Sequence, residues 1–231
     1  MVVRQFRYGN DNLGYVVHGK TEALAIDGGA IGPVTRYLEE NGLALTMITN
    51  THSHSDHTVG NDALMTRDTR LITPEEAAGA GEIIVEGHSI RVIPTPGHTL
   101  DSVCFHTPGF LMAGDTLFIG KVGRCFSGRT DLLLRSIRTL MTLPGDTVLY
   151  PGHDYVEEYL GWCRTLEPKN RHLDQAMRLY DRSDVRSTLG REKLVNPFLH
   201  MDNDDVEEAL KRRGLPRESI GERWNSLLGL M

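Results

Sequence analysis

The chain has 231 residues, of which 39% are hydrophobic and 24% are charged, and its formal net charge at pH 7 is -6. This length allows one large domain, or one domain with a small addition, and it buries enough surface for stability without disulfide bonds. The acidic balance argues against a protein that works on nucleic acid, because such proteins normally carry a basic excess.

The cysteines and the N-terminus indicate a reduced, cytoplasmic protein. Cys104, Cys125 and Cys163 are odd in number and widely spaced, with no C-x-x-C pair among them. The first residues contain no apolar stretch long enough for a signal peptide, and no run approaches the ~18 apolar residues of a membrane span. We therefore expect neither a nucleic-acid nor a membrane partner, and a monomer or a small homo-oligomer.

Short apolar runs broken by Gly, Pro, Asn and Asp fill the first part of the chain, a pattern typical of strands and turns. The expected strands are 5–8, 13–18, 23–26, 43–48, 83–85, 90–93, 103–106, 110–113 and 147–150. Helical patterns lie between them at 33–41, which opens on Pro33, and at 131–143. In the second of these, apolar residues recur at i, i+4, i+7 and i+8, which places them on one helical face.

After about residue 155 the strand pattern gives way to helical spacing. Tyr155, Tyr159 and Trp162 fall on one face of an expected helix. The stretch 203–213 begins with acidic residues and ends with basic ones, which suits the helix dipole, and a final amphipathic helix covers 220–228. We therefore expect an α/β domain at residues 1–160 and a helical C-terminal segment at residues 161–231.

The strongest motif is Thr-His-Ser-His-Ser-Asp-His at residues 51–57. It places four potential ligands within six residues, namely His52, His54, Asp56 and His57. Imidazole and carboxylate are ligands that zinc, iron and manganese accept. A metal site is therefore the favoured interpretation, with a histidine-rich surface loop as the alternative.

Three further residues extend this pattern. His98 lies in Pro-Gly-His-Thr, Asp115 in Ala-Gly-Asp-Thr and His153 in Tyr-Pro-Gly-His. Each follows an expected strand, as the first motif does, and in layered α/β folds the loops that leave strand ends form the functional edge. Glycine beside each residue lets several loops approach one point. The sequence therefore predicts one metal centre built from four strand ends.

Seven ligands are too many for one tetrahedral ion and suit two. The expected division is one ion held by His52, His54 and His98 and a second held by Asp56, His57 and His153. Asp115 would bridge the two ions, at the separation of about 3.5–4 Å that is typical of two-metal hydrolytic sites.

The other histidines have no ligand-type neighbours in the sequence, and we expect them to be surface or core residues: His18, His88, His106, His172 and His200. Cys125 follows Gly123 and Arg124 in the loop after Asp115. It could face the site, but we expect a packed thiol.

Together, these motifs resemble the metallo-β-lactamase superfamily over residues 12–155. The resemblance implies an α/β fold of the four-layer αββα type, with the metals at one edge of two sheets and a C-terminal helical segment here. Within that superfamily the chain most resembles the glyoxalase II group, the hydroxyacylglutathione hydrolases. The resemblance rests on four motifs: Gly-Asp-Thr-Leu-Phe-Ile-Gly from residue 114, Gly-Arg-Cys-Phe-Ser-Gly from residue 123, His-Asp-Tyr from residue 153 and Asn-Pro-Phe-Leu from residue 196.

The same resemblance implies the substrate contacts. Arg124 stands where many family members have Lys or Arg against the glutathione part, and Tyr155 matches the tyrosine of Gly-His-x-Tyr. Phe126 replaces a common tyrosine and so removes a hydroxyl donor. The family often ends with a spaced Arg and Lys pair that receives a glutathione carboxylate, and the run 211–213 is only a loose match to it.

The implied function is that of a binuclear metal-dependent hydrolase. It would cleave a thioester, S-D-lactoylglutathione or a related 2-hydroxyacyl thioester, to free acid and thiol. The expected cofactors are two divalent metal ions, with Zn favoured over Fe or Mn. The catalytic residues would be Asp56, which orients the attacking water, and Asp115, which bridges the metals. No Gly-x-Ser-x-Gly elbow offers a serine nucleophile.

Several alternatives remain at this point. A persulfide dioxygenase shares the ligand set but uses a single iron, and its group usually lacks the helical tail. A lactonase of the same fold keeps the bridging aspartate. A true β-lactamase generally has Cys or Ser in place of Asp115, and an RNA-processing nuclease is disfavoured by the acidic balance. A non-catalytic, metal-stabilised scaffold could lose ligands, whereas all seven are present.

Overall fold

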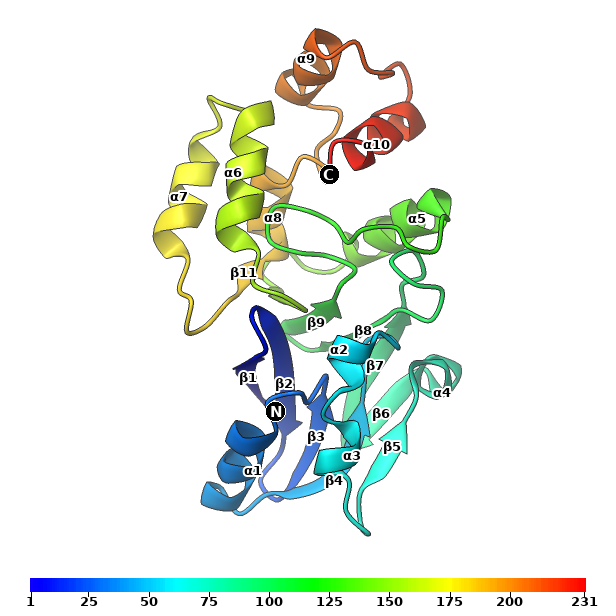
Figure 1. Ribbon diagram of the computed structural model, residues 1–231, viewed down its shortest axis with the longest axis vertical. Coiled ribbons are helices and arrows are strands. Elements are labelled where there is room, and N and C mark those ends of the chain that lie inside the picture. The colour runs from blue at the N-terminus through cyan, green and yellow to red at the C-terminus, as the bar shows by residue number, and fades with distance from the viewer.

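Two β-sheets form the body of the protein, whose computed structural model describes residues 1–231 (Figure 1). The first sheet has five strands in sequence order. They are β1 (Val2–Tyr8), β2 (Asn12–His18), β3 (Glu22–Ile26), β4 (Ala44–Thr49) and β5 (Arg70–Ile72). The β1–β2 and β2–β3 pairs are antiparallel, whereas β3–β4 and β4–β5 are parallel, so this sheet is mixed.

The second sheet has six strands, in the order β11-β10-β9-β8-β7-β6. They are β6 (Glu82–Val85), β7 (His88–Pro94), β8 (Val103–Thr107), β9 (Phe110–Gly114), β10 (Val148–Pro151) and β11 (Ser187–Thr188). Only the β9–β10 pair is parallel. Its long crossover, residues 115–147, carries a loop and a helix, as a parallel connection requires.

Alternation along β2 shows how the layers are built. Tyr15 and Val17 face the main core, which they share with Val92, Phe105 and other residues of the second sheet. Val16 points the other way, into a smaller core of nine buried residues closed by helix α1 (Ile31–Glu40). Because successive strand residues face opposite sides, one strand serves both cores.

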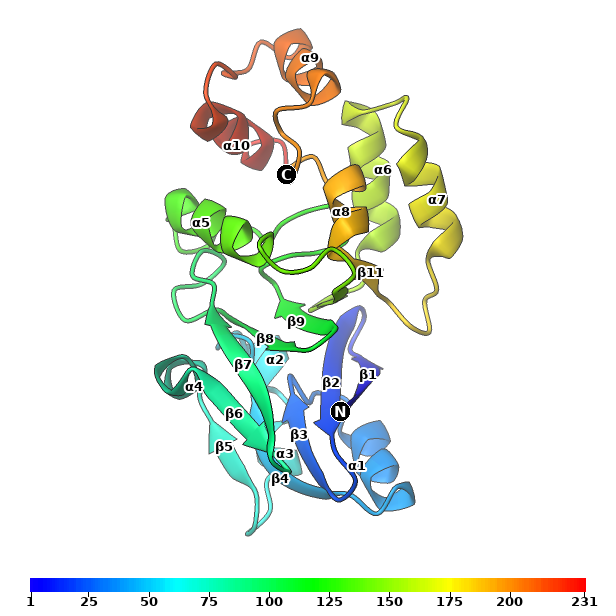
Figure 2. The same ribbon diagram turned by 180° about the vertical axis from the view of Figure 1, so that it is seen from behind.

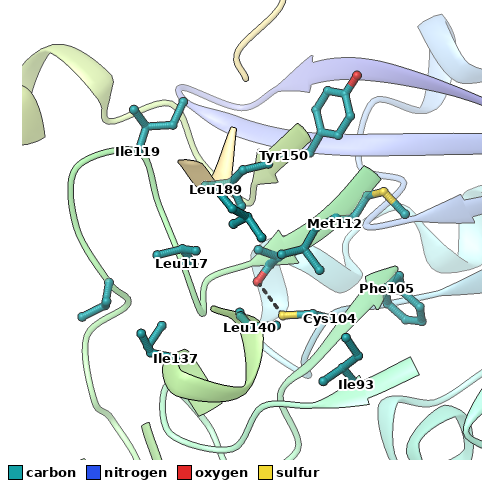
Figure 3. Packing of buried hydrophobic residues seen from close by; sticks show 14 of the residues in the cluster. Ile93, Cys104, Phe105, Met112, Leu117, Ile119, Ile137, Leu140, Tyr150 and Leu189 are labelled. Carbon is teal, nitrogen blue, oxygen red and sulfur yellow. Dashed lines mark hydrogen bonds between the residues drawn. The ribbon is translucent and has the colours of Figure 1, made fainter. Parts of the chain in front are cut away.

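The outer face of the second sheet is covered by helix α5 (Thr130–Leu140). Figure 3 shows its Ile137 and Leu140 beside Ile93 and Cys104, and all four belong to the main core. The Cys104 thiol donates to the carbonyl of Ala113 at 3.5 Å. With α1 outside the first sheet and α5 outside the second, the predicted αββα sandwich is confirmed (Figures 1 and 2).

The remaining helices fall into two groups. Three short ones belong to the body: α2 (Ser55–Thr58), α3 (Asn61–Leu64) and α4 (Pro74–Ala80). Five more follow β10: α6 (Val156–Leu166), α7 (Arg171–Leu179), α8 (Leu189–Val195), α9 (Asp204–Arg212) and α10 (Ile220–Leu228). Figure 1 shows this second group gathered at one end of the molecule, beyond β9 and α5. No helix combines the length and the apolar character needed to cross a membrane.

Most of the expected elements form, and the differences have local causes. All the expected strands are present with bounds shifted by a few residues, but the short β5 and β11 were missed because so few residues carry no period. Pro33 is not the first residue of α1, which begins at Ile31. Proline is tolerated there because the first turn has no intrahelical use for its N–H. The helix expected at 131–143 ends at Leu140.

Helix α4 was missed although its start signals are in the sequence. Thr73 and Glu76 form a capping box, in which each side chain accepts the other residue's backbone N–H, and Pro74 occupies the first turn. Residues after 160 also include the strand β11, which pairs with β10. The helical segment is therefore joined to the body by a sheet as well as by packing.

A buried carboxylate provides a second junction between the helical segment and the body. Glu192 of α8 is fully buried and accepts from the backbone N–H of Gly120 at 2.8 Å and from the Ser187 hydroxyl at 2.5 Å. Nearby, the Asn196 amide donates to the carbonyl of Lys121 at 3.0 Å. These contacts hold the loop after β9, and that loop contributes to the site described below.

Glu192 also predicts a pH-dependent stability. Burial raises its pKa from 4.5 to about 7 despite those hydrogen bonds. Between pH 4.5 and about 7, the Glu192 carboxyl is protonated in the folded protein and ionised in the unfolded chain. The stability that Glu192 contributes is therefore full below pH 4.5 and falls as the pH rises to about 7, by about 3 kcal/mol at 1.36 kcal/mol per pKa unit.

The isosteric variant Glu192→Gln stays neutral, so it should gain about that free energy relative to the native chain between pH 5 and pH 8. Urea unfolding of both proteins at several pH values measures the difference. A free-energy difference that does not change with pH would contradict the assigned protonation.

Candidate metal centre

Four strand ends bring the seven expected ligands together. The loop after β4 carries the motif at 51–57, with α2 turning Asp56 and His57 inward, while His98 follows β7, Asp115 follows β9 and His153 follows β10. The first loop comes from one sheet and the other three from the second. The cluster therefore lies at the edge where the two sheets adjoin, the place that the family resemblance implies for the metals.

One group of ligand atoms consists of three imidazole nitrogens. The Nε2 of His52 lies 2.9 Å from the Nδ1 of His54, and the Nε2 of His98 lies 3.2 Å from the same Nδ1. His52 and His98 are buried and His54 is half-buried. These three residues converge on one point, as expected for one ion of the pair.

A second group combines two imidazoles with a carboxylate. The Nε2 atoms of His57 and His153 lie 3.2 Å apart. The Oδ2 of Asp56 lies 3.5 Å from the first and 3.4 Å from the second. Asp56 is the most open ligand, with 47% of its side chain exposed, so this group faces the solvent side of the site.

Asp115 lies between the two groups. Its Oδ1 is 3.4 Å from the Nε2 of His57, and its Oδ2 is 3.5 Å from the Nε2 of His98 and of His153. The carboxylate thus contacts a histidine of the first group and both histidines of the second. Its Oδ1 is buried and has no hydrogen-bond partner.

The donor set fits a pair of divalent cations. Neutral imidazole nitrogens that face each other at 2.9–3.2 Å direct lone pairs at each other unless a proton or a cation lies between them. A buried carboxylate oxygen without a partner is likewise costly unless a cation completes it. Five imidazoles and two carboxylates are ligands that suit zinc, iron or manganese.

The pKa values of the clustered histidines also favour a bound cation. Burial lowers the pKa of His52 to about 4, which keeps its imidazole neutral and able to bind a cation. Burial also opposes charge on His57, but the carboxylates of Asp27 and Asp115 raise its pKa to about 11. A proton on His57 therefore supplies the positive charge that these two carboxylates require, and a metal ion would supply it instead.

Asp27 is the main outer partner of the cluster. It is fully buried and accepts from the Thr51 backbone N–H at 2.9 Å, from the Thr51 hydroxyl at 2.8 Å and from the Nδ1 of His57 at 3.0 Å. Its backbone adopts a φ of +52°, an uncommon conformation for a residue other than glycine. Asp27 thus fixes the start of the 51–57 loop and aims the Nε2 of His57 at the site.

Other histidines are aimed by similar contacts. The Nδ1 of His153 donates to Asp11 at 2.8 Å, and the Nδ1 of His98 donates to the carbonyl of Arg124 at 2.8 Å. In each case the hydrogen bond places the proton on Nδ1 and leaves Nε2 free to bind a metal.

Two glycines allow this close packing. At Gly114, whose φ is +48°, a Cβ atom would lie within 2.4–2.9 Å of the Thr51 side chain. At Gly152 a Cβ would lie 2.2 Å from the Oδ1 of Asp115. Any larger residue would push the strand ends apart, so these positions require glycine.

The three expected substrate contacts surround the cluster. Tyr155 stacks on His153, with ring centroids 5.0 Å apart and planes 5° apart. Phe126 is 60% exposed, and its ring lies 5.6 Å from His54 and 5.2 Å from His98. The Arg124 guanidinium lies 5.4 Å from the Phe126 ring.

The histidines and the cysteine that showed no sign of a metal role in the sequence lie outside the ligand groups. None of the five other histidines joins a group of three ligands: His18 contacts Tyr37, His200 pairs with Glu167, and the remaining three are exposed or partly exposed. Cys125 is partly buried against the main core.

Three residues that contact the cluster, Asp27, Asp11 and Asn12, were not predicted from the sequence. Asp27 follows the end of β3 and precedes Gly28, so the rule that found the other ligands could have found it.

Comparison with known proteins identifies two family matches. Residues 65–153 match the Metallo-beta-lactamase superfamily, and residues 154–222 match the Hydroxyacylglutathione hydrolase C-terminus. Among curated relatives, the hydroxyacylglutathione hydrolase of Chromohalobacter salexigens is 39% identical over 212 residues, which are 84% of this chain and 83% of the relative. That of Idiomarina loihiensis is 34% identical over 209 residues, with the same coverage of both chains.

Solved structures share the fold at lower identity. ETHE1 from Myxococcus xanthus superposes with a TM-score of 0.67 and 24% identity, over 100% of this chain and 99% of that one. The structure of TTHA1623 in a di-iron-bound form superposes with a TM-score of 0.58 and 23% identity, over 85% of this chain and 100% of that one.

Replacement of Asp27 tests its role as the residue that aims His57. Asp27→Asn keeps the size of the side chain but removes the charge beside the Nδ1 of His57. We expect metal affinity to fall about 10- to 100-fold, the usual cost of losing such an outer contact. Competition with a chromophoric chelator measures the affinity. Native affinity in this variant would show that Asp27 only holds the loop.

Proposed function

The chain belongs to the hydroxyacylglutathione hydrolase family of the metallo-β-lactamase superfamily, and we propose that its substrate is S-D-lactoylglutathione or a closely related 2-hydroxyacyl thioester. It is a metal-dependent thioester hydrolase that acts on a small molecule. Two observations support this substrate. Asp115 lies between the two ligand groups, and the chain continues into the family's C-terminal segment.

We assign His52, His54 and His98 to one ion and Asp56, His57 and His153 to the other, with Asp115 shared. Zinc is the proposed resident metal. Iron is the next candidate, since a protein of the same fold has been solved in a di-iron-bound form. When bound, such a pair acts as a Lewis acid and lowers the pKa of a bound water to about 7.

Asp56 is placed to orient the attacking water. Its carboxylate is half exposed, and the Asn12 amide fixes its Oδ2 by donating at 2.9 Å. Burial would raise the pKa of Asp56, but this hydrogen bond and the neighbouring His57 hold it below its ordinary value. An ionised carboxylate accepts a hydrogen from water and directs the oxygen towards a thioester carbonyl.

The thiolate leaving group needs little help from a general acid of the protein. A thiol has a pKa near 8.5, so the thiolate departs without a strong general acid. We assign Phe126 to the rim over the first ligand group and Tyr155 to the wall beside the second. Arg124 is exposed and forms no ion pair, so its guanidinium is available to a carboxylate of the thiol carrier.

We further propose that residues 1–160 hold the metals and that the helical segment 161–231 closes the thiol side of the site. Of the alternatives, the single-iron dioxygenase is disfavoured by the match of residues 154–222 to the hydrolase C-terminus. The likeness to ETHE1 from Myxococcus xanthus, at 24% identity, shows a shared fold only. A cytoplasmic location and the oligomeric state stay predictions.

Hydrolysis of S-D-lactoylglutathione by the metal-replete chain tests the proposed function. We expect thioester loss with two ions per chain, measured by absorbance at the thioester band alongside metal analysis. No turnover with two ions bound would reject glutathione as the carrier and direct the search to other thioesters and lactones. A single iron without turnover would favour the dioxygenase.

The variant Arg124→Ala tests the substrate contact. Because the guanidinium binds the carrier and takes no part in bond breaking, we expect KM for S-D-lactoylglutathione to rise by about tenfold while kcat changes little. Steady-state kinetics separate the two parameters. An unchanged KM would show that Arg124 makes no contact with substrate.

A further inference from the structure

An aromatic strip runs along α6 away from the metal centre. Tyr155 stacks on His153, and Tyr159 follows one helical turn later with its ring 5.1 Å from that of Tyr155. Trp162 continues the strip. Tyr155, Tyr159 and Trp162 are each only partly buried, so this face of the helix keeps contact with solvent. Tyr155 and Tyr159 thus place two aromatic rings in series beside the second ligand group.

The side chain of Lys121 ends on this strip. Its Nζ lies 4.3 Å from the centre of the Tyr159 ring and 4.5 Å from that of Trp162. Lys121 belongs to a tight turn after Asp115, closed by the bridge between Leu117 and Val122, so the same loop carries a metal ligand and this ammonium. Only 5% of the residue is exposed.

The ammonium of Lys121 has no partner of opposite charge. Lys121 forms no side-chain hydrogen bond and no ion pair with the protein, and its Nζ keeps access to solvent. The side-chain atoms that are buried without a partner belong instead to Asp115, Asp154 and Arg223. Glu158, exposed on α6, is the carboxylate that acts on it from a greater distance. Burial lowers the pKa of Lys121. By contrast, the buried Glu192 and Glu167 each have hydrogen-bond donors.

The stem of Lys121 is buried, while its ammonium lies over two aromatic faces and still reaches solvent. A carboxylate that took the place of this solvent would supply the opposite charge and acceptors for the N–H groups, which no protein group supplies. Ring-to-ring steps of 5.0 and 5.1 Å and a final 4.3 Å separate Nζ from His153. These steps need not be collinear, so their sum is the greatest possible distance between the His153 ring and the Nζ of Lys121. A tripeptide-sized thiol, about 10 Å long, covers most of that distance.

We propose that Lys121 is a specificity-determining residue that receives a carboxylate of the thiol carrier, at the far end of the Tyr155–Tyr159–Trp162 strip. The inference rests on the proposed function and deepens it, because it restricts the substrates to thioesters whose thiol part is anionic. Lys121 and Arg124 lie three residues apart on one loop, one buried on the strip and one exposed beside Phe126. The two cations suit a carrier with two separate carboxylates.

A purely structural role makes a different prediction. If Lys121 only joins the loop after β9 to α6 through its aromatic contacts, its replacement lowers stability and affects all substrates alike. A carboxylate-binding role affects only substrates that carry the carboxylate. The discriminating readout is therefore the ratio of KM values for two thioesters with the same acyl group.

The experiment compares the native chain, Lys121→Met and the control Lys20→Met. Lys20 is exposed in the turn between β2 and β3, outside the helical segment, so this control removes the same charge from the protein surface. The substrates are S-D-lactoylglutathione and S-D-lactoyl-N-acetylcysteamine, which has no carboxylate. Lys121→Met should raise KM for the first by about tenfold or more, with kcat and the second substrate little changed. Lys20→Met should leave both unchanged.

Equal changes for the two substrates, or no change for either, would overturn the proposal. Circular dichroism checks that Lys121→Met is folded, and Lys121→Gln, which keeps a polar end, takes its place if it is not. The native chain separates this result from a failure of the proposed function. If it hydrolyses neither thioester, the function itself is wrong and the carboxylate subsite falls with it.

Discussion

The carboxylate of Asp115 is the constraint on which the rest of this structure depends. It is buried, one of its oxygens has no hydrogen-bond partner, and it contacts histidines from both groups of ligands. A buried anion in that position is stable only with cations beside it, and the surrounding imidazoles are aimed so that their free nitrogens can hold cations. The fold can thus be understood as the scaffold that gathers four strand ends around this one side chain.

The close approach of these strand ends explains the residues found directly around the cluster. Gly114 and Gly152 leave no room for a side chain because the loops approach too closely, and Asp27 accepts a φ of +52° to bind both Thr51 and His57. The loop that follows Asp115 is in turn held by Glu192 of the helical segment. The segment after β10 therefore acts on the same loop that carries Asp115, the ammonium of Lys121 and two of the proposed substrate contacts, Arg124 and Phe126.

Much of this was predictable from the sequence, for identifiable reasons. The ligands stand in a dense motif or directly after strand-like runs, and the period of two that marks those runs depends on local burial alone. Asp11 and Lys121 could not be predicted, because their roles depend on which distant element packs against them: Asp11 meets His153 across the sheets, and Lys121 meets Tyr159 of α6. The short β11 was likewise missed, since its pairing with β10 is the only mark of its strand character.

The most direct test of a metal pair shared by Asp115 is a crystal structure of the metal-loaded protein, with anomalous diffraction measured at the absorption edge of the bound metal. We expect two anomalous peaks per chain, about 3.5–4 Å apart, with the carboxylate of Asp115 between them. One peak should lie among His52, His54 and His98 and the other among Asp56, His57 and His153. A single peak at full metal loading, or two peaks with Asp115 bound to only one, would contradict the shared role of this carboxylate.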